Sequence, residues 1–274
     1  MRRHASETAR PGRIWTVIGA AVPLRHCAST NRPSQGREQE RTADGKMTAW
    51  PRGPGVLASM TTMLQNDNRS RFDAIAAQWD ESPMRANMAK TIAAAIVAAV
   101  PLAPHWRALE YGCGTGLVGL RLLPHVGHLL ETDLSSGMLA VLGEKAAAAG
   151  LKNIATQVLD LTSTPPPAQR FDLIFSSMAL HHIPDVAALL RAFHAMLVPG
   201  GWVALADLDA EDGSFHTPDV PGVAHHGFAR QVVEEWLRAA GFSSIGFRTA
   251  HTVERERDGA QRRYPIFLAT ACRT

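Results

Sequence analysis

Short apolar runs alternate with helical segments through the middle of the chain, and this alternation constrains the fold more than any other feature. Strands that are separated by helices form βαβ crossovers, so the pattern predicts a parallel sheet with helices on both faces. The predicted strands are Arg107–Tyr111, Val126–Thr132, Ile154–Leu159, Phe171–Ser176 and Trp202–Asp207. The predicted helices are Phe72–Trp79, Met84–Val100, Leu117–Leu123, Ser135–Ala149 and Val186–Leu197.

The alternation changes after Asp207. A polar loop follows, and then a segment over Ala229–Ala240 with helical periodicity. Two further apolar runs, Ser243–Ala250 and Tyr264–Ala271, are joined through the charged stretch Glu254–Arg263. A short connection between two strands predicts an antiparallel pair that completes the sheet.

Positive charge is concentrated at the N-terminus. The net charge of the whole chain is +3, but residues 1–59 hold ten Lys and Arg against four Asp and Glu, and residues 60–274 hold eighteen against twenty-one. A mildly acidic body argues against nucleic acid as a partner. Residues 1–59 are rich in Arg, Pro, Gly and Ser, which predicts an extension that is disordered or absent from the native protein. We therefore expect one domain over residues 60–274, whose activity does not need the extension.

The three cysteines show neither a pairing pattern nor metal-ligand spacing. This usage is typical of a reducing compartment, and we expect a cytoplasmic protein with no bound metal. No run approaches the roughly 18 apolar residues that a membrane span needs, so no membrane association is expected. The sequence makes no prediction of the oligomeric state.

The segment Glu110-Tyr111-Gly112-Cys113-Gly114-Thr115-Gly116 marks a sharp turn out of the first predicted strand. Glycines at such a turn permit positive φ angles and let a ligand approach the backbone closely. The pattern alone does not name the ligand, because Gly114, Gly116 and Gly119 also satisfy the dinucleotide fingerprint. A nicotinamide- or flavin-dependent oxidoreductase therefore stays open as an alternative function.

Acidic residues end three consecutive predicted strands: Glu110, Asp133 and Asp160. Open α/β sheets bind ligands at the carboxyl ends of their strands, where Asp133 could accept hydrogen bonds from ribose hydroxyls and Asp160 one from an adenine amino group. A carboxylate at Glu110 would repel a pyrophosphate. It suits S-adenosylmethionine, which carries an ammonium and a sulfonium and no phosphate. The acids therefore favour that nucleoside over a dinucleotide.

Five further motifs follow the glycine segment in order. They are Thr132-Asp133-Leu134-Ser135-Ser136-Gly137-Met138-Leu139, Asp160-Leu161, Phe171-Asp172-Leu173-Ile174, Ala179-Leu180-His181-His182 and Leu197-Val198-Pro199-Gly200-Gly201. From roughly Phe72 to the C-terminus the chain resembles the class I S-adenosylmethionine-dependent methyltransferases, and most of all the small-molecule branch with the ubiquinone and menaquinone C-methyltransferases. The resemblance implies a doubly wound, Rossmann-like α/β fold with a seven-stranded sheet of order 3-2-1-4-5-7-6, the last strand antiparallel. It also implies methyl transfer from S-adenosyl-L-methionine to a small-molecule acceptor.

The same resemblance implies a set of cofactor-binding residues. They are Glu110, Gly112, Gly114 and Gly116 around the methionine moiety, Asp133 followed by Leu134 at the ribose, Met138 and Leu161 beside the adenine, Asp160 at its amino group, Ser176 at the reacting centre, and Trp79 as an aromatic lid. An indole face can attract a sulfonium. Helix packing is the alternative role of Trp79, and the sequence leaves both open.

Methyl transfer depends mainly on alignment of the acceptor, and a general base is an optional addition. The candidates for a base are His181 and His182 after the fourth strand, and Asp209 and His216 in the polar loop after the fifth. His181 and His182 belong to a motif that is widespread in the branch, so a role in ordering the loop is their alternative. The polar loop could equally be a solvated surface. A protein that binds the cofactor without catalysis is a further alternative.

Overall fold

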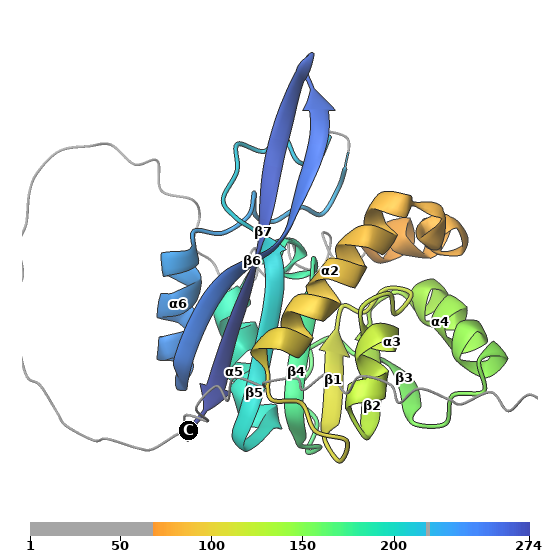
Figure 1. The fold of residues 1–274 in the computed structure, drawn as a ribbon, viewed down its shortest axis with the longest axis vertical. Helices are drawn as coiled ribbons and strands as arrows, with labels where there is room; N and C mark the ends of the chain where they lie inside the picture. The colour runs from red at the N-terminus through yellow and green to blue at the C-terminus, as the bar shows by residue number, and fades with distance from the viewer. Residues whose placement is uncertain (1–67, 218–219) are drawn as a thin grey trace, which may run out of the picture.

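The computed structural model describes residues 68–217 and 220–274, so the expectations for residues 1–59 lie outside the described residues. Seven strands form one sheet in the order β3-β2-β1-β4-β5-β7-β6 (Figure 1). Strand β7 is antiparallel to both of its neighbours, and the other neighbouring strands are parallel. This arrangement confirms the predicted fold class. The strands are β1 Arg107–Tyr111, β2 His128–Asp133, β3 Ile154–Val158, β4 Phe171–Ser177, β5 Leu197–Leu208, β6 Phe242–Arg257 and β7 Ala260–Arg273.

Helices precede, connect and follow these strands. Residues 68–75 are helical and continue into the 3-10 helix η1, so the first helix begins earlier than the sequence predicts. The helix predicted over Leu117–Leu123 is shorter, because Pro124 lies in a 3-10 turn that follows it directly. The helices are η1 Ala76–Glu81, α2 Pro83–Ala99, α3 Gly119–Leu122, η2 Leu123–His125, α4 Ser136–Ala148, η3 Leu180–His182, α5 Val186–Met196 and α6 Arg230–Ala239.

Local sequence accounts for where the helices begin. Ser135 caps α4 by accepting a hydrogen bond from the Met138 amide, and Asp185 caps α5 by accepting one from the Ala188 amide. Such caps satisfy amides that have no partner inside the helix. Helix α2 begins with Pro83, whose missing N–H costs nothing at the first position of a helix. Among the described residues, no helix is both long and apolar enough to cross a bilayer.

The central strands are buried on both faces, which is why their sequences are continuous apolar runs rather than alternating ones. In β4, Leu173 and Phe175 pack in the core on the side of α2 and α3. Ile174, between them in sequence, packs on the other side with Phe193 of α5 and Leu237 of α6. Full burial of each such side chain contributes about 1.5–3 kcal/mol to folding, so the two cores fix the strand ends that carry the site.

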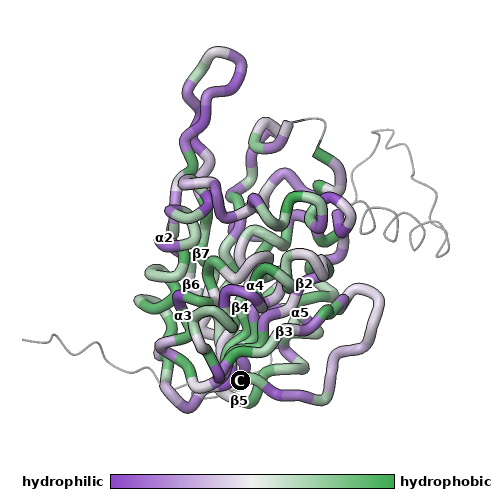
Figure 2. Tube along the Cα trace, turned by 90° about the vertical axis from the view of Figure 1, so that its right-hand side faces the viewer, coloured by the Kyte–Doolittle hydropathy of each residue, from purple (hydrophilic) through white to green (hydrophobic). Residues whose placement is uncertain are grey.

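The C-terminal hairpin is longer than the sequence predicts. The charged stretch Glu254–Arg263 was expected to connect two strands, but most of it belongs to them, and β6 pairs with β7 as far as Arg257 and Ala260. The turn is Asp258-Gly259, and both residues have positive φ, of 52° and 75°. An Asp-Gly pair favours the tight turn that continues a hairpin, so the strands extend to it. The hairpin projects beyond the body of the protein, and its tip is hydrophilic (Figures 1 and 2).

Candidate functional site

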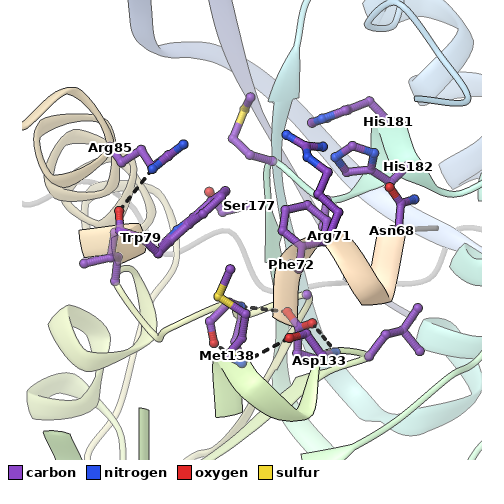
Figure 3. A pocket seen from close by; sticks show the side chains of 18 of the residues that line it. Asn68, Arg71, Phe72, Trp79, Arg85, Asp133, Met138, Ser177, His181 and His182 are labelled. Atoms are coloured by element: carbon purple, nitrogen blue, oxygen red, sulfur yellow. Dashed lines mark hydrogen bonds between the residues drawn. The ribbon is translucent and has the colours of Figure 1, made fainter. Parts of the chain in front are cut away.

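A cavity of about 330 Å³ lies at the carboxyl ends of β1, β2 and β4, where the strand order reverses. Ligands of doubly wound sheets bind at this position. The residues after the three strands form its floor, and residues 68–89, the loop after β5 and the hairpin contribute to its wall. In Figure 3, Trp79 and Arg85 lie on one side, His181 and His182 on the other, and Asp133 and Met138 at the base.

The glycine loop has the backbone that the sequence predicts. Gly112, Gly114 and Gly116 have φ angles of 72°, 54° and 77°, a region that side chains disfavour. Gly112 and Gly114 line the cavity, whereas Gly116 does not. A Cβ at Gly116 would lie 2.5 Å from Leu142 Cδ1. Gly116 therefore allows α4 to pack closely against the loop, and the other two glycines expose backbone to the cavity.

Asp133, at the end of β2, ties the glycine loop to the start of α4. Its carboxylate accepts hydrogen bonds from the amides of Gly114 and Ser135, at 2.8 and 2.9 Å. Burial raises the pKa of Asp133, although these amides oppose the shift. A carboxylate offers about four acceptor positions, so acceptor capacity remains for a ligand in the cavity. The adjacent Leu134 and the fully buried Met138 also line the cavity.

The segment that precedes β1 is fastened over the cavity by acidic residues that sequence analysis did not single out. Asp73 accepts hydrogen bonds from the Ser135 hydroxyl and the Gly137 amide, at 2.6 and 2.8 Å. Asp80 accepts one from Thr115 and forms an ion pair with Lys145. The contacts of Asp73, and the ion pair of Asp80 with Lys145, join residues more than 60 positions apart in the sequence. The contact of Asp80 with Thr115 joins the segment to the glycine loop. The fastened segment places Trp79 beside Gly114.

Trp79 is held by its neighbours as part of the cavity wall. Its indole packs edge-to-face against Phe72, with centroids 5.6 Å apart. The guanidinium of Arg85 lies over the Trp79 ring, 3.9 Å from the ring centroid, and donates a hydrogen bond to the backbone carbonyl oxygen of Trp79. A Cβ on Gly114 would lie 3.9 Å from Trp79 Nε1. Trp79 therefore lines the cavity and also packs against other side chains, and its role as an aromatic lid stays a prediction.

Glu110 has a different environment from the one predicted. The register of β1 and β2 places it beside Glu131, and both carboxyl groups are buried below Gly119, whose Cβ would lie 2.5 Å from Glu110 Oε2. Burial and the opposing Glu131 raise the pKa of Glu110 well above its usual range, and burial raises the pKa of Glu131. Glu110 contributes to the cavity wall, but a protonated acid next to a second acid is a poor partner for a cofactor ammonium.

Two further predicted cofactor residues, Asp160 and Leu161, lie outside the cavity lining. The Asp160 carboxylate accepts hydrogen bonds from Thr162 and Ser163 in its own turn, and Leu161 is buried behind it. Leu159 lines the cavity instead. The structure therefore gives no support to a contact between Asp160 and an adenine amino group.

Ser176 and Asp209 are also outside the lining, because each makes a structural contact. The Ser176 hydroxyl donates to the Tyr111 carbonyl oxygen at 2.7 Å, which joins β4 to β1, and Ser177 lines the cavity in its place. Asp209 accepts two hydrogen bonds of 2.7 Å from Arg230 at the start of α6. A carboxylate that holds a bidentate arginine is a poor general base.

His181, His182 and His216 gather on one side of the cavity, and all three line it. His181 Nδ1 lies 2.8 Å from Asp207 Oδ1, and its Nε2 lies 3.3 Å from His216 Nε2. His182 Nδ1 lies 2.8 Å from the Gly222 carbonyl oxygen. Asp207, the residue before the last of β5, is the member of this group that the sequence does not single out as a functional residue. Residues far apart in the chain therefore share one hydrogen-bonded group.

Burial and the neighbouring side chains together set the pKa values of His182, His216 and Asp207. Burial, with His181 nearby, lowers the pKa of His182 to about 3. Burial, with His181, Arg71 and Arg255, lowers the pKa of His216 to about 4. Burial alone would raise the pKa of Asp207, but His181 and the surrounding N–H donors hold it below its usual range. At neutral pH, Asp207 is therefore a carboxylate and His182 and His216 are neutral.

The three imidazoles are also the group of described residues whose geometry suits a metal ion, since one ring nitrogen of each lies within 4.8 Å of the others. Neutral imidazole is a common ligand of zinc and related ions. However, the group includes no carboxylate ligand, and Arg71 and Arg255 lie close enough to lower the pKa of His216. Two nearby cations oppose a divalent ion, so the expectation of no metal stays our prediction.

Residues 108–201 match the methyltransferase domain family. An uncharacterized methyltransferase of Schizosaccharomyces pombe is 30% identical over 150 residues, which cover 50% of this chain and 53% of that protein. The ubiquinone biosynthesis O-methyltransferase of Marinobacter nauticus is 28% identical over 159 residues, which cover 53% of this chain and 63% of that protein. The match thus spans just over half of each of these relatives.

A solved structure, the complex of DhpI with SAH, has a similar fold. The TM-score is 0.59 at 23% sequence identity, over 77% of this chain and 96% of that chain. At this level of identity the likeness concerns the fold.

Proposed function

We propose that this chain, which carries a class I methyltransferase domain, transfers a methyl group from S-adenosylmethionine to a small-molecule acceptor. The observation that carries the proposal is the position of Asp133. Its carboxylate lies at the end of β2, bonded to the amides of Gly114 and Ser135, with acceptor capacity left toward the cavity. This is where a doubly wound sheet holds the ribose of a nucleoside cofactor.

The residues of the cavity fit S-adenosylmethionine. With the cofactor bound, Gly112 and Gly114 would let its methionine part approach the backbone, Asp133 would accept from the ribose hydroxyls, and Met138 with Leu134 would lie against the base. Trp79 would cover the sulfonium side. The match of residues 108–201 to the methyltransferase domain family favours the methyltransferase over the nicotinamide- or flavin-dependent alternative.

When bound, S-adenosylmethionine supplies a methyl carbon that its sulfonium already activates for in-line displacement. The protein has to hold the acceptor in line with this carbon and exclude water, which can contribute on the order of 7–11 kcal/mol. The segment over residues 68–82 serves both purposes, because Asp73 and Asp80 fasten it across the cavity.

For an acceptor that loses a proton, we assign its removal to His216 and His181. The Asp207 carboxylate fixes the proton of His181 on Nδ1, so Nε2 presents a lone pair to His216. His216 takes the proton of the acceptor and passes its own Nε2 proton to His181. The imidazolium formed at His181 is then stabilised by Asp207, which is fully buried. Asp209 has no part in this step.

Titration calorimetry with S-adenosylhomocysteine and with NADH tests the proposed function. We expect S-adenosylhomocysteine to bind, and Asp133→Asn to weaken its binding at least about tenfold, since the variant presents one acceptor oxygen in place of two. Asp172→Asn is the matched control, because Asp172 accepts one backbone hydrogen bond at the opposite end of the sheet. Binding of NADH without any response to S-adenosylhomocysteine would overturn the proposal. If S-adenosylhomocysteine binds, an assay of methyl transfer from labelled S-adenosylmethionine to fractions of a metabolite pool would identify the acceptor.

The cytoplasmic location, the absence of a nucleic-acid or membrane partner and the dispensability of residues 1–59 remain predictions from composition. The oligomeric state is left open.

A further inference from the structure

Five arginines line the cavity, and three of them lie at its hairpin end: Arg85 at the start of α2, and Arg255 and Arg257 on the projecting part of β6. Among the described residues, none of the three forms an ion pair with an Asp or Glu, although other arginines of the chain do. Cations in a partly enclosed site are normally paired. These three instead contact aromatic rings and carbonyl oxygens.

The contacts of Arg255 fix its guanidinium without neutralising it. Arg255 Nη1 donates to the Phe215 carbonyl oxygen at 2.8 Å, and the guanidinium lies 4.2 Å from the centroid of the Phe215 ring. Arg257 donates to the carbonyl oxygens of Ser214 and Phe215. A planar guanidinium held in this way keeps further N–H donors available and suits two oxygens of a carboxylate or phosphate.

The arginines form one positive region. Burial and the neighbouring Arg71 lower the pKa of Arg85, and burial with Arg257 and Arg85 lowers the pKa of Arg255. Each cation is therefore close enough to disfavour the charge of another. Asp133, Glu110 and Asp207 belong to the floor and the histidine group, so this end of the cavity lacks an anion among the described residues. An anionic ligand would remove the repulsion.

Arg255 also lies next to the proposed proton acceptor. Phe215, whose ring and carbonyl it contacts, precedes His216 in the chain, and Arg255 contributes to the low pKa of His216. An anionic group bound at Arg255 would place the adjoining part of the same molecule at His216. Arg85, which contributes to the same positive region, lies away from the cofactor residues Asp133 and Met138 at the base of the cavity (Figure 3).

We propose that the methyl acceptor carries a carboxylate or phosphate group and that Arg255, assisted by Arg85 and Arg257, binds this group at the hairpin end of the cavity. The inference rests on the proposed function, because it names the substrate class of that site. Residues 60–274 are slightly acidic in composition, but β6 extends beyond the other strands of the sheet and places Arg255 and Arg257 at the cavity. The cavity can therefore bind an anionic substrate.

The test uses the full chain saturated with S-adenosylhomocysteine and three probes: phenyl phosphate, phenylacetate and neutral benzyl alcohol. We expect at least one anion to bind saturably and more tightly than benzyl alcohol, and Arg255→Gln to weaken that anion about tenfold or more. Comparison of the two anions distinguishes phosphate from carboxylate. Arg255→Lys keeps the charge and should retain part of the affinity. Arg263→Gln is the matched control, because Arg263 lies on the same hairpin and pairs with Glu254.

Several outcomes would overturn the inference. One is that both anions bind no better than benzyl alcohol, and another is that Arg255→Gln binds the anion with unchanged affinity. A third is that Arg255→Gln loses as much affinity for S-adenosylhomocysteine as for the anion, which would assign Arg255 to the carboxylate of the cofactor. A failure of the wild-type chain to bind S-adenosylhomocysteine would instead refute the proposed function. If Arg255→Gln does not fold, raising salt from about 20 to 200 mM must weaken binding of the anion to the wild type and leave benzyl alcohol unaffected. Equal salt dependence of the two probes would then overturn the inference.

Discussion

Asp207→Asn is the substitution that tests the histidine group most directly. Asp207 is completely buried and accepts four hydrogen bonds. Its Oδ2 accepts from the amides of Leu180 and His181, at 2.9 and 3.3 Å, and its Oδ1 accepts from His181 Nδ1 and the Leu208 amide, at 2.8 and 2.7 Å. An asparagine has one acceptor oxygen and one NH₂ group, so it cannot serve both pairs of donors.

Each orientation of the new amide has its own cost. With the NH₂ toward Leu180, two backbone amides lose their acceptor, at about 1–3 kcal/mol each. With the NH₂ toward His181, the imidazole must move its proton to Nε2, and it can then no longer accept a proton from His216. In either orientation two buried donors lose the carboxylate oxygen that accepted from them, which costs about 2–6 kcal/mol in total. We therefore expect the free energy of unfolding to fall by about this amount and methyl transfer to fall with it.

Urea denaturation followed by circular dichroism measures the stability, and labelled methyl transfer measures the rate. Asp172→Asn is again the control, because Asp172 accepts one backbone hydrogen bond, from Arg107, in an exposed position, and should cost less than about 1 kcal/mol. Equal stability of the two variants, together with an unchanged rate and pH profile in Asp207→Asn, would refute the reasoning.

Two other predictions concern the glycine loop and the acids below it. The pKa values of Glu110 and Glu131 are raised in the folded chain. Above the ordinary glutamate pKa of about 4.3, the unfolded chain therefore binds fewer protons than the folded chain. The free energy of unfolding should then decrease as the pH rises from 5 to 8. Glu131→Gln should flatten this decrease in urea titrations while the exposed Glu144→Gln does not, and parallel curves for all three proteins would contradict the assignment. Gly112→Ala would place a Cβ 2.5 Å from that of Ala179 at a φ of 72°, so we expect S-adenosylhomocysteine binding to be lost, whereas Gly143→Ala, with no atom within 4 Å of the added Cβ, should bind normally in calorimetry.

The fold followed from the sequence because its signals are local and repeated. Each buried strand is an apolar run, and turns or caps such as Ser135 and Asp185 mark where helices begin. The carboxyl ends of parallel strands must then meet at one edge, which placed Asp133 correctly at the cavity. The sequence predicts the last two strands too short, because the charged residues of Glu254–Arg263 indicate a connection, although Asp258-Gly259 is itself a strong turn signal.

The features that sequence analysis missed depend on contacts across the chain. Asp209 and Asp207 are equally acidic in sequence, and their difference arises because Arg230 of α6 takes one and His181 takes the other. The pairing of Glu110 with Glu131 needs the register of β1 and β2. Asp160 satisfies its oxygens within its own turn, which the strand-end rule does not consider. Burial and hydrogen-bond partners, rather than residue type, therefore decide which acids can meet a ligand.

The distribution of charge in the cavity links the two proposals. Of the three acids predicted to surround the cofactor, Asp133 is the one whose carboxylate lines the cavity with acceptor capacity to spare, because burial beside Glu131 favours the protonated form of Glu110 and Asp160 lies outside. The opposite end carries Arg85, Arg255 and Arg257. A sulfonium bound between these ends would face guanidinium groups in a partly enclosed space, and that repulsion would oppose binding of the cofactor. An acceptor with an anionic group removes it, since the anion lies between the arginines and the sulfonium. An anionic acceptor therefore reduces the excess of positive charge in this cavity when the cofactor is bound, which favours an enzyme that takes both substrates before it reacts.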